Sequence, residues 1–252
     1  TKDFPIMPKI RKETVLKIDS KEFRSSLLSV LDSSAISETR PELNGIFVNI
    51  LENKIEFAAT DSFRLSEKIT KISLGSPKAF IVPRNTIFEA IRILEDQDGD
   101  ISICVSDNQL LIYSPEFELV SRLIDGRYPE YKKVIPEKFM SLAKVNKFEF
   151  EKNIRLASVF SSSISDVKLK AEGNKIEISA KNSDRGEINS SLNCELTNKP
   201  FEINVNYHYI LDGLKSIPVE DIVLEYAGDG SPLVIRGENK KDQTYIIMPL
   251  RT

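Results

Sequence analysis

The sequence has few of the residues from which catalytic and metal centres are usually built. It contains one histidine, His208, and two cysteines, Cys104 and Cys194, which form neither a CxxC pair nor a cluster with metal-ligand spacing. The patterns GxxxxGK[ST], GxGxxG and HExxH are absent, so phosphate cradles and zincin chemistry have no support. We therefore predict no catalytic residue, no metal and no cofactor.

Long apolar runs and low-complexity tracts are also missing. No stretch approaches the roughly 18 apolar residues of a membrane span, so no membrane partner is expected. A composition of 40% hydrophobic and 29% charged residues is typical of a folded globular protein. The two cysteines lie in different halves of the chain, in expected strands, which favours packed, reduced thiols and a cytoplasmic location. A net charge of −3 argues against a protein that binds free DNA tightly through an overall positive charge.

The chain contains an internal repeat. Asn53-Lys54-Ile55-Glu56 recurs as Asn174-Lys175-Ile176-Glu177, and the apolar stretch that Phe80 opens starts again at Phe201, at the same shift of 121 positions. A unit of this length is large enough for a core of its own. The repeat predicts two similar domains, at 13–136 and 137–252. Residues 1–12 contain Pro5 and Pro8 and are interpreted as an extended linker.

Helical and strand periodicities alternate in the same order in both copies. Helices are expected after Asp19, near Pro83, around the apolar stripe Phe150, Ile154 and Ala157, and after Asn206. Alternating residues predict strands at 46–50, 54–60, 101–105, 110–113, 118–124, 167–171, 175–180, 188–194, 222–226, 233–236 and 245–249. This order favours an α+β class, with two helices per domain on one face of antiparallel sheets.

Three segments stand out from this pattern: 59–67 (ATDSFRLSE), 125–136 (DGRYPEYKKVIP) and 245–252 (YIIMPLRT). Structural explanations exist for each, namely a hairpin corner, an interdomain linker and a closing strand. Taken in order, ATDSFRL, LIDGRYPEYKKVIP and MPLR resemble the bacterial sliding clamps, the β subunits of DNA polymerase III. The resemblance covers essentially the whole chain, and Thr1-Lys2-Asp3-Phe4-Pro5 resembles the family's link out of its first domain. It implies the DNA-clamp fold, with this chain corresponding to the second and third domains.

The resemblance implies a non-catalytic processivity factor of the replicative polymerase, associated with the nucleoid. Two three-domain subunits of that family form a homodimeric ring, and helices line the hole through which double-stranded DNA slides. A chain without the first domain is expected to be a monomer, because the ring contact joins the third domain to the first domain of the other subunit. Candidate DNA-facing cations are Lys21, Arg24, Arg84, Arg92, Lys147, Lys152 and Arg155; ordinary solvated helix faces are the alternative.

The resemblance also implies a groove between the second and third domains that binds peptides of DNA polymerase, the clamp loader and repair proteins. This chain has Ser62 and Phe63 where glycine and histidine are common in the family, which affects partner preference. The positions carried over are Leu43, Thr60, Ser62, Phe63, Arg64, Leu65, Pro129, Lys133, Val134, Tyr209, Ile246, Ile247, Met248, Pro249, Leu250 and Arg251.

Two other function classes compete with this interpretation. One is an enzyme that uses the same cleft, with Asp61, Arg64 and Asp125 as polar groups. Asp61 and Asp125 lie beside turn residues, where carboxylates commonly bond the local backbone, and His208 between two tyrosines is typical of a surface or packing residue. The other is a two-domain nucleic-acid-binding protein without ring topology. Apolar groove residues favour peptide binding over bond chemistry.

Overall fold

A computed structural model describes residues 13–36, 39–106 and 108–250. The expected linker at 1–12 and the terminal Arg251 and Thr252 lie outside these ranges. The chain forms two compact units, a first unit of Thr1–Phe57 and Ile69–Tyr128 and a second unit of Ala58–Lys68 and Pro129–Thr252. The second unit therefore includes two segments, 58–68 and 129–136, that the sequence-based division at 136 assigns to the first domain.

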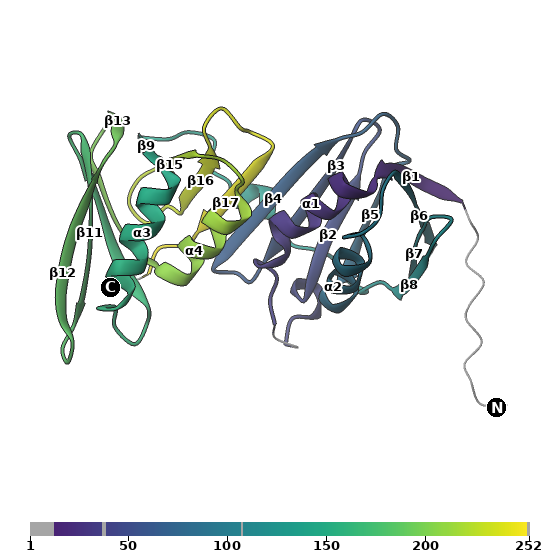
Figure 1. The fold of residues 1–252 in the computed structure, drawn as a ribbon, viewed down its shortest axis with the longest axis horizontal. Coiled ribbons are helices and arrows are strands. Elements are labelled where there is room, and N and C mark those ends of the chain that lie inside the picture. Colours follow the sequence, from purple (N-terminus) through teal and green to yellow (C-terminus); the bar gives the residue numbers. More distant parts are fainter. Residues whose placement is uncertain (1–12, 37–38, 107, 251–252) are drawn as a thin grey trace. The chain divides into compact units, whose positions relative to one another are not determined.

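The first unit has two helices, α1 (Ser20–Leu31) and α2 (Arg84–Ile93), packed against each other (Figure 1). One antiparallel sheet has the order β1-β6-β7-β8, and a second group of strands has the order β3-β2-β5. Their bounds are β1 Thr14–Asp19, β2 Gly45–Ile50, β3 Lys54–Thr60, β5 Lys78–Pro83, β6 Asp100–Ser106, β7 Gln109–Tyr113 and β8 Glu118–Arg122, with a 3-10 turn at Pro41–Leu43. In the core, the rings of Phe23 and Phe57 pack edge to face, with 5.7 Å between their centroids.

The second unit repeats this plan with α3 (Lys147–Ser158) beside α4 (Tyr207–Ser216). One sheet has the order β12-β11-β10-β14, and the other strands follow as β13-β9-β15-β16-β17-β4. Their bounds are β4 Arg64–Lys71, β9 Ser141–Asn146, β10 Asp166–Glu172, β11 Lys175–Asn182, β12 Gly186–Asn193, β13 Glu195–Asn198, β14 Phe201–Asn206, β15 Asp221–Tyr226, β16 Leu233–Gly237 and β17 Gln243–Ile247, with a 3-10 turn at Tyr131–Val134.

The four predicted helices are confirmed, and polar caps explain where three of them begin. Asp19 accepts hydrogen bonds from the backbone N–H groups of Lys21 and Glu22, Asn146 from that of Glu149, and Asn206 from that of His208. The fourth helix, α2, starts directly after Pro83. The apolar stripe predicted for α3 is buried, since Phe150, Ile154 and Ala157 are all 0% exposed.

The expectation that both thiols are packed inside the protein is met. Cys104 and Cys194 are buried and form no disulfide within the described residues, and burial raises the pKa of the Cys194 thiol, which favours the neutral form. None of the described helices is long and apolar enough to cross a membrane. Several strands were not predicted: β1, β4, β5, β9, β13 and β14.

Helix α4 packs closely on β17 through Gly213. A Cβ atom at this position would lie 2.6 Å from two ring carbons of Tyr245, a residue that is 1% exposed. The ring therefore requires a glycine on the helix surface above it.

We predict that Gly213→Ala lowers the free energy of unfolding by about 1–2 kcal/mol. Overpacking costs about 1–3 kcal/mol, and the better helix propensity of alanine offsets up to about 1 kcal/mol of this. Urea denaturation measures the change. In a Tyr245→Leu background the same substitution should cost less, because the ring is gone; an equal cost in both backgrounds would contradict the packing explanation.

Candidate functional site

The antiparallel pairing of β4 with β17 brings two of the unusual segments together. Arg64 lies opposite Ile247, Leu65 opposite Ile246, and the ladder continues to Lys68 opposite Gln243. Beyond its end, the backbone N–H of Met248 donates to the carbonyl of Phe63 at 2.8 Å. The turn at 60–64 and the segment at 246–250 therefore form one continuous surface of the second unit.

The turn that precedes β4 is fixed by local hydrogen bonds. Asp61 Oδ1 accepts from the backbone N–H groups of Phe63 and Arg64, both at 2.9 Å, while the Thr60 hydroxyl donates to the carbonyl of Arg64 at 2.6 Å and accepts from the N–H of Ser62 at 3.1 Å. Ser62 has a φ of 80°, in the left-handed region that favours glycine. The turn role expected for Asp61 is confirmed, and the strained Ser62 explains why glycine suits this position.

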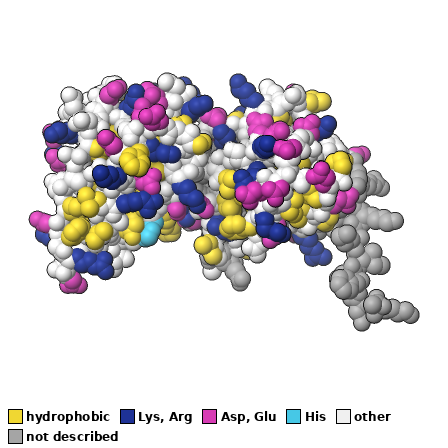
Figure 2. Space-filling model, viewed as in Figure 1, with side chains coloured by type: hydrophobic (Ala, Val, Ile, Leu, Met, Phe, Trp, Pro, Cys, Tyr) yellow, Lys and Arg dark blue, Asp and Glu magenta, His cyan; other side chains and the backbone are white. Residues whose placement is uncertain are grey.

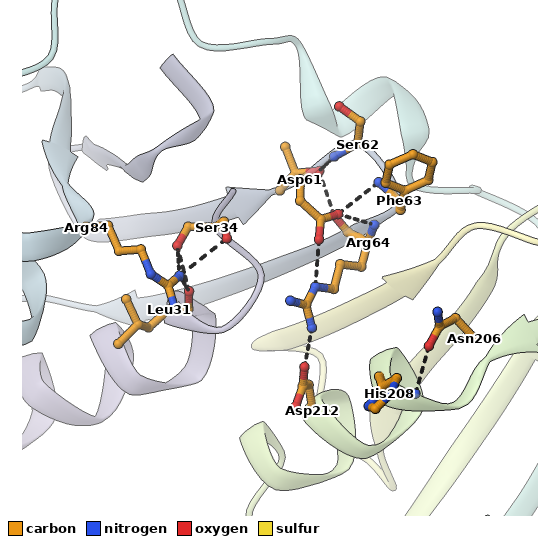
Figure 3. Close-up of polar contacts among 11 residues, drawn as sticks. Leu31, Ser34, Asp61, Ser62, Phe63, Arg64, Arg84, Asn206, His208 and Asp212 are labelled. Carbon is orange, nitrogen blue, oxygen red and sulfur yellow. Dashed lines mark hydrogen bonds and ion pairs between the residues drawn. The ribbon is translucent and has the colours of Figure 1, made fainter. Parts of the chain in front are cut away.

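Arg64 joins this turn to helix α4 through an arrangement that we call the clasp, formed by Asp61, Arg64, Tyr209 and Asp212. The Nε of Arg64 donates to Asp61 Oδ2 at 2.9 Å, and its Nη1 donates to Asp212 of α4 (Figure 3). The guanidinium also lies over the ring of Tyr209, 4.7 Å from its centroid. Since the side chain of Arg64 is only 12% exposed, its charge is largely committed within the protein.

The pKa shifts in the clasp follow from this geometry. Burial alone lowers the pKa of Arg64, but the neighbouring Tyr245, Asp212 and Asp61 outweigh burial and raise it. Burial, together with the negative charge of Asp61, raises the pKa of the Tyr209 phenol. At neutral pH the clasp therefore contains a charged guanidinium and a neutral phenol.

The predicted groove residues fall into two classes of exposure. Leu65, Ile246 and Ile247 are at most 3% exposed, so they belong to the buried interior and offer little area to a partner. Among the predicted groove residues of the second unit, the accessible apolar ones are Phe63, at 61% exposure, and Val134, at 44%, with Tyr209, Met248, Pro249 and Leu250 partly exposed. Thr60 and Pro129 are also partly exposed, and Lys133 forms an ion pair with Glu130. Leu43 belongs to the first unit, where it is buried, and Arg251 lies outside the described residues.

Two of the predicted DNA-facing cations of the first unit, Arg84 and Arg24, are engaged at helix ends. Arg84, the first residue of α2, donates from Nη1 to the Leu31 carbonyl at 2.7 Å and to Ser34 at the end of α1 (Figure 3). Arg24 of α1 donates from Nε to the Ile91 carbonyl at 3.0 Å, near the end of α2. Because carbonyls at a helix C-terminus attract cations, each helix stabilises the end of its antiparallel neighbour.

The second unit repeats this arrangement. Lys147, the first residue of α3, donates from Nζ to the carbonyls of Ile217 at 2.8 Å and Leu214 at 3.3 Å, at the end of α4.

Three other predicted cations form exposed ion pairs: Lys21 with Asp98, Arg92 with Glu89, and Arg155 with Glu151. Acidic and basic side chains are correspondingly interspersed on the face that Figure 2 shows.

Lys152 differs from the other six predicted cations. It is exposed, and it forms no hydrogen bond or ion pair within the described part of the chain. Lys152 is therefore the predicted cation whose charge is most available to an external partner.

Within the part of the chain that the structure describes, no group of His, Cys, Asp and Glu side chains is arranged to hold a metal ion.

Sequence reasoning missed Asp212. The only available signal is its position three residues after Tyr209, which places both side chains on one face of α4. The ion pair that gives Asp212 its role joins residues 148 positions apart, which helical spacing cannot indicate.

This arrangement, two α+β units of one plan with a terminal strand that completes an apolar surface, is the architecture of tandem clamp domains. The model of the DNA polymerase III beta subunit central domain matches residues 17–130, and that of its C-terminal domain matches residues 132–251. The chain belongs to this family, the bacterial sliding clamps.

Individual relatives agree with this assignment. The beta sliding clamps of Staphylococcus epidermidis and Staphylococcus aureus are each 26% identical over 253 residues, which span 99% of this chain and 67% of the relative. Among solved structures, a Bacillus subtilis sliding clamp is similar with a TM-score of 0.95 and 26% identity, covering all of this chain and 68% of the other. A Pseudomonas aeruginosa clamp solved with bound griselimycin has the same fold, with a TM-score of 0.95, 24% identity and coverage of 100% and 69%.

We predict that Lys147→Met lowers the free energy of unfolding by about 1–2 kcal/mol. The substitution keeps a long apolar side chain but removes the charged donor from the end of α4, and such hydrogen bonds contribute about 1.5–3 kcal/mol. Lys152→Met on the same helix is the matched control and should change stability by less than about 0.5 kcal/mol. Equal effects of the two substitutions in urea denaturation would argue against the capping role.

Proposed function

We propose that this sliding clamp carries a partner-peptide site on the surface formed by Phe63, Val134, Tyr209, Met248, Pro249 and Leu250. The observation that carries the proposal is the fixed turn at 60–64, which holds an aromatic ring 61% exposed beside the partly exposed segment after β17. The partners proposed from family membership are the replicative polymerase, the clamp loader and repair proteins, together with double-stranded DNA.

The chemistry of this surface suits an extended peptide with apolar anchors. One or two Leu or Phe side chains buried on it contribute roughly 1.5–3 kcal/mol each. Micromolar affinity requires about 8 kcal/mol, so two anchors and a few backbone hydrogen bonds are adequate. A fixed turn helps because little conformational freedom is lost at the site on binding.

The competing enzyme hypothesis has little support from the same residues. The two oxygens of Asp61 bond the turn backbone and Arg64, and Arg64 is paired with two carboxylates, so two of the three polar groups named for catalysis are engaged in holding the structure. We infer a non-catalytic binding role in the cytoplasm.

For DNA, we propose weak contacts that depend on charge more than on fixed hydrogen bonds. Lys152 is the foremost candidate, since its ammonium group has no partner within the described residues. The remaining six cations keep their charge while their donors are engaged, so they contribute to the local potential without fixing a register.

We predict that a peptide with a Gln-Leu-x-Leu-Phe-like core binds this chain with micromolar affinity. Phe63→Ala should weaken binding about five- to thirty-fold, because it removes about 1–2 kcal/mol of apolar contact. Isothermal titration calorimetry measures both affinities. The matched control is Phe148→Ala, which removes a 73% exposed ring from α3, a helix that contributes no residue to the proposed surface, and should leave the affinity unchanged. Absence of binding at about 100 μM peptide would contradict the proposal.

The oligomeric state of this chain stays a prediction from the family resemblance. We expect a monomer in sedimentation velocity at micromolar concentration, because the resemblance places half of the ring contact in a domain to which no part of this sequence corresponds. A stable dimer of ring size would contradict this expectation.

A further inference from the structure

The 3-10 turn Tyr131–Val134 ends at Val134, one of the exposed apolar residues of the proposed surface. Backbone hydrogen bonds of 2.7–3.2 Å run within residues 129–135, each between residues two or three positions apart. Bonds of this kind define the shape of a short turn. They do not define where the turn lies on the sheet of the second unit.

The side chain of Tyr131 joins the turn to strand β4. Its hydroxyl donates to Glu67 Oε1 at 2.8 Å, and both residues are buried, with exposures of 5% and 7%. Glu67 lies opposite Thr244 in the ladder between β4 and β17, and it forms no other hydrogen bond or ion pair within the described residues. A bond to a buried carboxylate is strong, and its loss leaves a polar group unpaired in the interior.

A cavity beside this bond makes it more important for the position of the turn. Ile135 and Pro136, which directly follow the turn, line a cavity of about 550 Å³ together with Glu67 and Thr244. Side chains that face such a space have no contact atoms on that side. Close packing therefore does not fix the chain after the turn on the sheet.

We propose that Tyr131 and Glu67 are positioning residues of the partner-peptide site; this inference rests on the proposed function. Their hydrogen bond holds the turn on β4 and so keeps Val134, which is 44% exposed, in place for an apolar anchor of the peptide. Without the bond the turn occupies several positions, and Val134 contacts the peptide in only a fraction of the molecules.

The test measures the affinity for one peptide with a Gln-Leu-x-Leu-Phe-like core by fluorescence anisotropy, at a temperature at which circular dichroism shows the variants folded. Tyr131→Phe removes only the hydroxyl and should weaken binding about two- to five-fold. Glu67→Met removes the acceptor and should weaken binding to the same extent. Glu67→Gln keeps an acceptor oxygen of the same reach, so its affinity should stay within about 1.5-fold of the wild type.

The matched control for the loss of a buried hydroxyl is Tyr226→Phe. Tyr226 is 6% exposed, and its hydroxyl also donates to a carboxylate, that of Asp229 at 3.1 Å, in the loop between β15 and β16. Neither residue belongs to the proposed surface. This variant should therefore retain the wild-type affinity.

A double-mutant cycle with Val134→Ala separates positioning from a general loss of structure. Val134→Ala alone should weaken binding about three- to ten-fold, because it removes two methyl groups from the contact. In the Val134→Ala background, Tyr131→Phe should change the affinity by less than about 1.5-fold, since no apolar side chain remains to be positioned.

Two results would overturn the inference while leaving the peptide site intact: wild-type affinity in Tyr131→Phe, or equal losses from this substitution with and without Val134. If Tyr131→Phe does not fold, equal affinities of Glu67→Met and Glu67→Gln would overturn it as well. If the wild type binds no peptide, the proposed function itself fails, and this inference fails with it.

Discussion

The ladder between β4 and β17 is the interaction on which the proposed binding surface depends. It joins the segment at 64–68 to the last strand of the chain, so residues that are far apart in sequence form one sheet. Two contacts of the surface follow from this register: the carbonyl of Phe63 accepts from the N–H of Met248, and Arg64 reaches Asp212 of α4. A shift of one residue would turn Leu65 and Ile246 out of the core and move Arg64 away from Asp212.

Local signals in the sequence were sufficient for a large part of the fold. Asp19 and Asn206 predict the starts of α1 and α4 because their side chains bond the nearest backbone N–H groups. The apolar stripe of α3 predicts which side of that helix is buried. In each case the partners lie within one or two helical turns, so a short stretch of sequence contains the whole interaction.

Long-range partners account for what the sequence did not predict. Residues 59–67 were interpreted as a hairpin corner, and strand β4 was not predicted. Its polar Ser66 and Glu67 are buried, and Glu67 accepts a hydrogen bond from the Tyr131 hydroxyl. The role of Asp212 depends in the same way on a distant arginine. Likewise, helical spacing placed Arg84 and Lys147 on outer faces, but only the structure shows their donors at the ends of neighbouring helices.

The capping of one helix by a cation from its neighbour has a mechanical consequence for a protein that must move along its ligand. A guanidinium or ammonium group whose N–H donors already bond carbonyls still attracts phosphates by its charge. It forms no fixed hydrogen bond with any one phosphate, since those donors are already used within the protein. The resulting energy profile along the duplex would be shallow, with little difference between successive positions. If Arg84 and Lys147 face the duplex as proposed, the bonds that join the helix pairs would also leave these two charges without a fixed phosphate partner.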